Sequence, residues 1–137
     1  MPANTTPIFA NVIKNPAAQI LPADASAYKT LMTGGTNGSR LDNLIATSND
    51  TSARVLSFAI NDGALDHPIG EVSIPATAGN DGAASVKGVS VLNSTNFPGL
   101  KEDGSLYLQS TFILKVKSLT TVTAAKQIDL VGFGGDF

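Results

Sequence analysis

Hydrophobic and polar residues alternate along this chain in short runs, and turn signals separate the runs. The clearest run covers residues 54–61, where every second side chain is a large apolar one. Two further runs with this period lie at residues 111–117 and 127–133. Successive side chains of a β-strand point to opposite faces, so a period of two predicts strands with one buried face.

Weaker runs of the same kind predict strands at residues 28–33, 40–47, 69–74 and 106–109, and a short edge strand at 8–13. The strand at 40–47 would have Leu41 and Ile45 on one face and Leu44 on the other; a helix competes there, but turn signals at both ends favour a strand. Residues 85–97 match a short helix and a strand about equally. Gly88 weakens the helix, and we expect a helical turn or an irregular segment there.

Polar-glycine turns punctuate the sequence at Asn37-Gly38, Asp62-Gly63, Asp81-Gly82 and Asp103-Gly104. These dipeptides readily adopt the positive φ angles of tight hairpin turns. No helical pattern is long enough to support a βαβ unit. The sequence therefore predicts an all-β fold: a single antiparallel β-sandwich, jelly-roll-like, with an extended N-terminal arm. The expected core comprises Leu56, Phe58, Ile60, Phe112, Leu114, Val116, Ile128 and Leu130.

A length of 137 residues matches one domain, which we divide into an arm at 1–13 and a sandwich at 14–137. The first seven residues are small and polar with a proline near each end, and an apolar run follows at 8–13. Such a segment can add to the sheet edge of another chain, or it can be the first strand of its own sheet. The candidate assembly contacts are Ile8, Phe9, Val12, Ile13 and Phe137.

The composition leaves little reactive chemistry. The chain has no Cys or Trp, one His, 15% charged residues and a net charge of −2. Disulfides and thiolate metal sites are excluded, and scattered basic residues argue against nucleic-acid binding. We expect neither a signal peptide nor a membrane span. The low charge indicates a surface that docks onto a larger assembly, or a plain surface of Ser, Thr, Asn and Gly.

Candidate catalytic and metal-binding residues are sparse. His67 follows Asp66 directly, and adjacent strand residues face opposite ways, so we interpret His67 as a surface residue. The pairs Asp62 with Asp66 and Glu102 with Asp103 could hold a weak cation, but turn chemistry explains both more simply. The glycines at 34–38 lack the Lys-Ser/Thr pair of a phosphate loop. We therefore predict no catalytic, cofactor or metal site, and no enzyme.

Three short motifs resemble a known group of proteins. They are the G-x-N-G-[ST]-R entry at 35–40, the T-x-A-R segment at 51–54 and the terminal G-G-D-[FY] at 134–137. In this order they are similar to motifs of small structural proteins of tailed bacteriophages. The bend at 98–100, Leu106-Tyr107-Leu108 and the start at 4–7 are also similar.

This resemblance implies a virion component without enzymatic activity, and some proteins of the group look like capsid decoration, or cement, proteins. We therefore expect a protein that is made in the host cytoplasm and stabilises the head from the capsid surface. It would bridge subunits of the major capsid protein as a homo-oligomer, a trimer at local threefold positions. One alternative is a virion protein associated with the neck, tail or fibre. Another is a carbohydrate-binding attachment module, although two Tyr and no Trp count against it.

Overall fold

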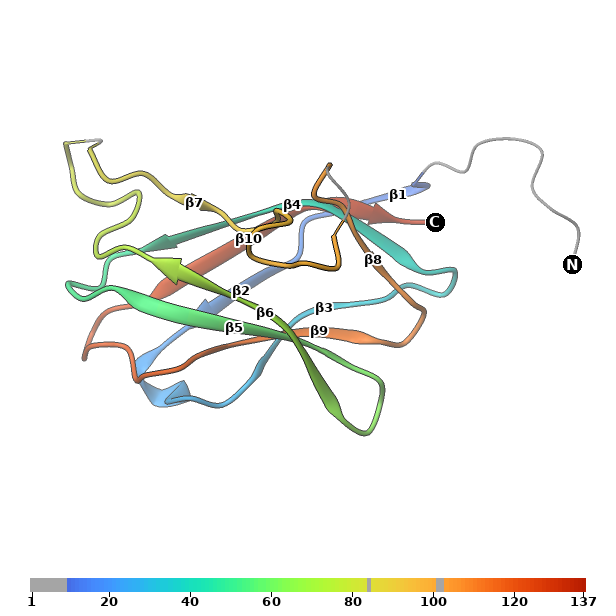
Figure 1. Cartoon of the computed structure of the whole chain (residues 1–137), viewed down its shortest axis with the longest axis horizontal. Coiled ribbons are helices and arrows are strands. Elements are labelled where there is room, and N and C mark those ends of the chain that lie inside the picture. Colours follow the sequence, from blue (N-terminus) through green and yellow to red (C-terminus); the bar gives the residue numbers. More distant parts are fainter. Residues whose placement is uncertain (1–9, 84, 101–102) are drawn as a thin grey trace, which may run out of the picture.

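A computed structural model describes residues 10–83, 85–100 and 103–137, and it shows two antiparallel sheets packed face to face (Figure 1). The elements in chain order are β1 (Val12–Lys14), β2 (Ala17–Ile20), the 3₁₀ turn η1 (Pro22–Asp24), β3 (Lys29–Thr33), β4 (Ser39–Ser48), β5 (Arg54–Asn61), β6 (Asp66–Ile74), β7 (Val89–Ser90), β8 (Leu106–Leu108), β9 (Ile113–Ser118) and β10 (Ile128–Asp136). The predicted all-β sandwich is confirmed.

The first sheet, sheet A, is built around β10 and β4. β1 and β2 pair with successive parts of one edge of β10, and β4 pairs with the other edge. The short strands β7 and β8 lie on the far edge of β4. The second sheet, sheet B, has the order β3-β9-β5-β6.

The pairs are nested along the chain. β1 and β2 pair with β10, β3 with β9, β4 with β7 and β8, and β5 with β6. The first strands therefore meet the last, and the nesting closes at the β5–β6 hairpin. Because strands from both halves of the chain alternate in each sheet, residues far apart in sequence become neighbours.

The core lies between the sheets and contains six of the eight predicted core side chains: Leu56, Phe58, Leu114, Val116, Ile128 and Leu130. Phe58 packs edge to face against Phe97, with ring centroids 5.4 Å apart. Ile60 and Phe112 are only partly buried against this core. Phe112 is less buried than expected because it precedes β9 and follows Thr111, whose φ of 68° marks a turn.

Several strand boundaries differ from the prediction. β2 was not expected, and β6 begins at Asp66 instead of residue 69. Within the ambiguous stretch, Val89–Ser90 form β7, and the neighbouring residues form turns and bends. β10 continues past Phe133 to Asp136, with a bulge between Phe133 and Gly134 that shifts its register on β4.

The predicted boundary of the N-terminal arm, after Ile13, falls within β1. Val12 and Ile13 are the first residues of β1, paired with Asp136 and Gly135 of β10. The backbone N–H of Asn11 also donates to the carbonyl oxygen of Asp136, at 2.8 Å. A boundary after Ile13 would therefore divide a strand of sheet A. Residues 1–9, including Ile8 and Phe9, lie outside the described residues.

Candidate functional site

The segments 35–40 and 134–137, which carry two of the three motifs, lie side by side at one end of sheet A. β4 and β10 pair so that Ser39 is opposite Asp136 and Arg40 is opposite Gly135. One set of these side chains points into the sandwich and the other points outward, because neighbouring strand residues alternate. The two motifs therefore form one structural unit with two faces.

The inward face is a polar network around the Asp136 carboxylate. Ser39 Oγ donates to Asp136 Oδ1, and Lys14 Nζ lies 3.2 Å from the same oxygen. Lys14 Nζ also donates to the carbonyl oxygen of Thr33 at 2.7 Å, which links β1 of sheet A to the end of β3 in sheet B. The network thus holds the two sheets together at this end.

This network requires an ionised carboxylate at Asp136 and a residue without a side chain at Gly35. The hydrogen bond from Ser39 holds the pKa of Asp136 below its ordinary value, and Lys14 adds to this while burial opposes it. The N–H of Gly35 donates to Ser39 Oγ at 2.8 Å. A Cβ at Gly35 would lie 2.7 Å from the Asp136 carboxyl carbon, so a side chain there would displace the carboxylate.

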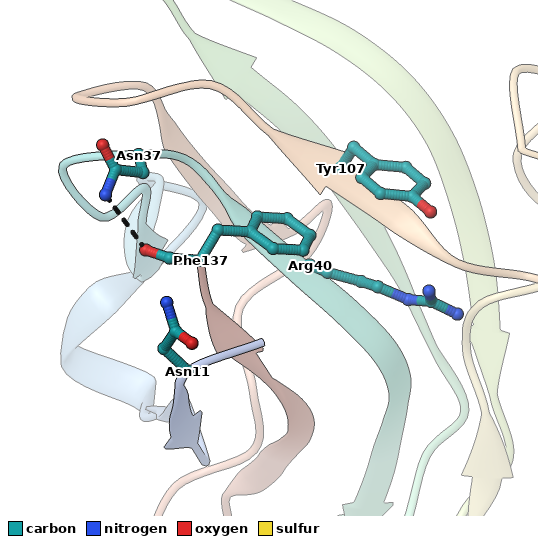
Figure 2. A pocket seen from close by; sticks show the side chains of 5 residues that line it. All are labelled: Asn11, Asn37, Arg40, Tyr107 and Phe137. Carbon is teal, nitrogen blue, oxygen red and sulfur yellow. Dashed lines mark hydrogen bonds between the residues drawn. The ribbon is translucent and has the colours of Figure 1, made fainter. Parts of the chain in front are cut away.

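The outward face carries a shallow depression of about 510 Å³, lined by Asn11, Asn37, Arg40, Tyr107 and Phe137 (Figure 2). These residues come from the segment before β1, the turn before β4, β4 itself, β8 and the residue after β10. In the sheet register, Ile13, Gly135, Arg40 and Tyr107 form one row across four strands.

Two aromatic rings stand beside each other in this depression. The rings of Tyr107 and Phe137 are nearly parallel, with an interplanar angle of 5° and centroids 6.4 Å apart. The Arg40 guanidinium lies over Tyr107, 5.7 Å from the ring centroid. Phe137 is held by its N–H to the carbonyl oxygen of Gly38 (3.1 Å) and by Asn37 Nδ2 to its own carbonyl oxygen (3.4 Å).

Sequence reasoning identified only part of this depression. Phe137 was a candidate assembly contact, and here it is partly buried against Tyr107. Tyr107 was not named as a candidate, although 51% of it is exposed. The available signal was its place between two buried leucines in 106–108, which predicts an outward-facing tyrosine.

Carboxylates balance the charge at the rim. Arg40 Nε lies 2.6 Å from Asp42 Oδ1, and Arg40 Nη2 lies 3.9 Å from Asp103 Oδ2. The hydrogen bond with Asp42 raises the pKa of Arg40, so the guanidinium stays charged and paired. The depression therefore has no net positive charge to attract an anionic ligand.

The third motif, at 51–54, belongs to a separate buried network around Asp50. The Asp50 carboxylate is fully buried and accepts from Arg54 Nε (2.8 Å) and Thr123 Oγ1 (2.7 Å). Burial opposes its ionisation, but the bonds from Arg54 and Thr123 outweigh burial and hold the pKa of Asp50 far below its ordinary value. This network connects β5 to the loop after β9, and we interpret its role as structural.

His67 lies in the β5–β6 hairpin, and its side chain is 57% exposed. Its Nε2 is 2.9 Å from Asp62 Oδ2, while Asp66 contacts Asn61 and Lys115 instead. Within the described ranges, no cluster of three His, Cys, Asp or Glu could hold a metal ion. Of the other candidate cation pair, Glu102 lies outside the described residues.

The outer face of sheet A also exposes a group of large apolar side chains. Ile45 on β4 lies opposite Val131 on β10, and these are 36% and 40% exposed. Phe133 on β10 is 45% exposed, and Ile13 on β1 is 88% exposed. We call these four residues the apolar face. Val12, another candidate contact, is 59% exposed at the sheet edge.

Comparison with known proteins gives a likeness in fold. No family model matches the chain, and no curated protein matches it. One chain in the acidic stable capsid structure of Helicobacter pylori bacteriophage KHP30 is similar, with a TM-score of 0.57 and 13% identity. The match covers 91% of this chain and 88% of that chain, so the likeness in fold extends over nearly the whole length of both. Residues 10–83, 85–100 and 103–137 contain no helix long and apolar enough to cross a membrane.

Proposed function

We propose that this protein is a structural component of a bacteriophage virion, and specifically a decoration protein that stabilises the capsid by bridging neighbouring subunits. The observation that carries the proposal is the likeness, over 91% of the chain, to a chain of similar length in a phage capsid. The three motifs that resemble phage structural proteins point to the same class. The proposal includes no catalytic activity and no nucleic-acid or membrane binding.

The order of the strands supports the proposal. The first strands of the chain pair with its last strands, and each further pair lies inside the previous one along the sequence. Such a chain can be described as a long hairpin folded over into two sheets. Nested pairing between a six-stranded and a four-stranded sheet is similar to the strand order of a jelly roll, an architecture that occurs in viral capsid domains. Fold alone does not determine function, so the argument also needs a surface suited to assembly.

The apolar face supplies such a surface. Ile13, Ile45, Val131 and Phe133 expose large side chains on one side of one sheet, and only 15% of the whole chain is charged. Contiguous exposed apolar patches on small proteins mark interaction sites. We propose that this face, together with Val12 and Phe137, contacts a neighbouring capsid subunit or a second copy of this chain. Contacts by Ile8 and Phe9 remain predictions.

A trimer at local threefold positions would suit a decoration role. Three linked copies bind their capsid neighbours with an avidity far above the affinity of one copy. A modest apolar face on each copy would then be sufficient. The alternative location, at the neck, tail or fibre, would use the same face on a different partner.

A binding assay on capsids that lack the protein tests the proposal. Phe133→Ser removes an exposed apolar side chain from the apolar face, and Leu65→Ser removes one from the β5–β6 turn, where Leu65 is 64% exposed. We expect Phe133→Ser to lower capsid occupancy and Leu65→Ser to leave it unchanged. Equal binding by both variants would contradict a role for the apolar face, and no binding by the wild-type protein would contradict decoration.

A further inference from the structure

We propose that the depression between Tyr107 and Phe137 binds a neutral pyranose sugar. This activity differs from capsid decoration because its ligand is a sugar and not a capsid subunit, although the depression shares Phe137 with the proposed capsid contact. Its lining combines two aromatic rings, two amide side chains and one guanidinium around a shallow hollow. An apolar platform with a few converging polar groups is the general form of a small-molecule site.

The aromatic pair gives the site its shape preference. Fully overlapping parallel rings are disfavoured, and offset rings in contact share only part of their faces. With centroids 6.4 Å apart, Tyr107 and Phe137 are strongly offset. Tyr107 is 51% exposed. Its flat apolar surface matches the face of a pyranose ring, where C–H groups point outward and hydroxyl groups lie around the edge.

The rim gives the site its polar complement. The Asn11 amide offers a carbonyl oxygen and an NH₂ group, and the Asn37 amide offers its oxygen and the N–H that does not bind the Phe137 carbonyl oxygen. Arg40 Nε donates to Asp42 and Arg40 Nη2 to Ser105, so a ligand would use the remaining N–H groups of Arg40. Sugar hydroxyls both donate and accept, so neighbouring hydroxyls can pair with the two ends of one amide. Figure 2 shows Asn11 and Asn37 near Phe137, with Arg40 extending toward Tyr107.

Charge selects a neutral sugar over an acidic one. Arg40 is paired with Asp42 at 2.6 Å and lies 3.9 Å from Asp103. An acidic sugar would have to approach a guanidinium that one carboxylate already binds, beside a second carboxylate. A neutral hexose or N-acetylhexosamine meets no such repulsion.

Strand pairing positions the backbone of Tyr107, Arg40 and Gly135 before any ligand arrives. Tyr107 lies on β8 in register with Arg40 on β4, and Arg40 in turn faces Gly135 on β10. Gly135 lies between Ile13 and Arg40 in this row and is buried. A Cβ at Gly135 would lie 2.6 Å from the carbonyl oxygen of Val12 and 2.7 Å from the Cβ of Ala10, so the start of the described chain packs closely on β10 here. Preorganisation of this kind reduces the entropic cost of binding.

The chain contains a matched control for the test. It has two tyrosines, and Tyr28 lies away from the depression, with Lys117 Nζ 4.5 Å from its ring centroid. Tyr28→Ala and Tyr107→Ala therefore make the same chemical change at two places. Circular dichroism would first establish that both variants remain folded, and Tyr107→Phe would serve as a milder variant that keeps the ring.

The experiment is saturation-transfer NMR, with amide chemical shifts, on the purified full chain with maltotriose, triacetylchitotriose or 3′-sialyllactose. We expect a neutral trisaccharide to receive saturation and to shift the amides of residues 37–40, 107 and 137. Tyr107→Ala should weaken this binding about tenfold or more, Tyr107→Phe should weaken it less, and Tyr28→Ala should leave it unchanged.

Three results would overturn the proposal: no transfer to either neutral sugar, equal losses in the two Ala variants, or preferential binding of sialyllactose. If the wild type binds no sugar, and Tyr107→Ala loses capsid binding while Tyr28→Ala keeps it, the depression belongs to the capsid contact instead. Phe133→Ser should keep its sugar binding, which separates this proposal from the decoration proposal.

Discussion

Ser39 Oγ donates a hydrogen bond to the Asp136 carboxylate, joining two residues that are 97 positions apart in the chain. The bond connects the start of β4 to the end of β10, and Lys14 of β1 completes the group from the other side. Residues of three strands therefore depend on one carboxylate. The motifs at 35–40 and 134–137 are separate in the sequence but form one unit in the fold.

Asp136→Asn should destabilise the protein by about 1–2 kcal/mol, because a charge-assisted bond from Ser39 and an ion pair with Lys14 are lost. Asp129→Asn is the control on the same strand, where the carboxylate contacts only the Gln127 side chain among the bonds described. Urea unfolding of both variants measures the difference. Equal stability of the two variants would contradict a structural role for Asp136.

Asp50→Asn should cost more, about 3–5 kcal/mol, because it leaves the largely buried Arg54 without its carboxylate partner. Asp42→Asn removes the partner of Arg40, another Arg–Asp pair, but both of those side chains are well exposed. We expect its thermal unfolding midpoint to stay close to that of the wild type. Equal thermal unfolding midpoints for Asp50→Asn and Asp42→Asn would contradict a stabilising role for the buried network around Asp50.

Acid should weaken the protein through Asp50 and Asp136. Their pKa values in the fold lie below the ordinary value of 3.8, so their ionised forms stabilise the native state at neutral pH. This contribution is complete well above pH 3.8 and is lost as the pH falls below it. Unfolding curves at several pH values should show the gap between wild type and Asp50→Asn narrowing toward about pH 2. A constant gap would count against ionic stabilisation.

Phe58→Ala should destabilise the protein more than Phe112→Ala. Phe58 is 1% exposed and packs on Phe97, so its loss should cost about 3–5 kcal/mol. Phe112 is only partly buried at the turn before β9, so less packing is lost there. Denaturant unfolding of the two variants would decide, and a larger loss at Phe112 would place the core elsewhere.

Deleting residues 2–9 and deleting residues 2–13 should differ in their effect on the stability of the protein. The shorter deletion ends before β1, whereas the longer one removes Val12 and Ile13, which pair with β10. We expect only the longer deletion to lower the unfolding midpoint. If residues 2–9 contribute to assembly, the shorter deletion should bind capsids more weakly while keeping its fold. Full retention of capsid binding would end the arm hypothesis.

The sequence predicts those strands whose period of two is uninterrupted. β5 was predicted with its observed bounds, because each second residue from Leu56 is apolar and a turn follows Asn61. β2 was missed because Ala17 and Ala18 carry little pattern and prolines flank the segment. The end of β10 was missed because two glycines interrupt its alternation, although they still pair with β4.

The site was harder to predict than the strands. Its motifs were visible, but the pairing of β4 with β10 is a long-range register that local patterns do not contain. Tyr107 reaches the site because β8 pairs with the edge of β4 that faces away from β10. This pairing places Tyr107 opposite Arg40. Phe137 was named from its terminal position, and its stacking on Tyr107 needed the three-dimensional fold.

Cryo-electron microscopy of the purified virion tests the central claim most directly. The decoration proposal predicts density for this sandwich on the outer capsid surface, in threefold groups at local threefold positions. It also predicts that the apolar face of Ile13, Ile45, Val131 and Phe133 lies against a neighbour. Density for the sandwich only at the neck, tail or fibres would contradict decoration.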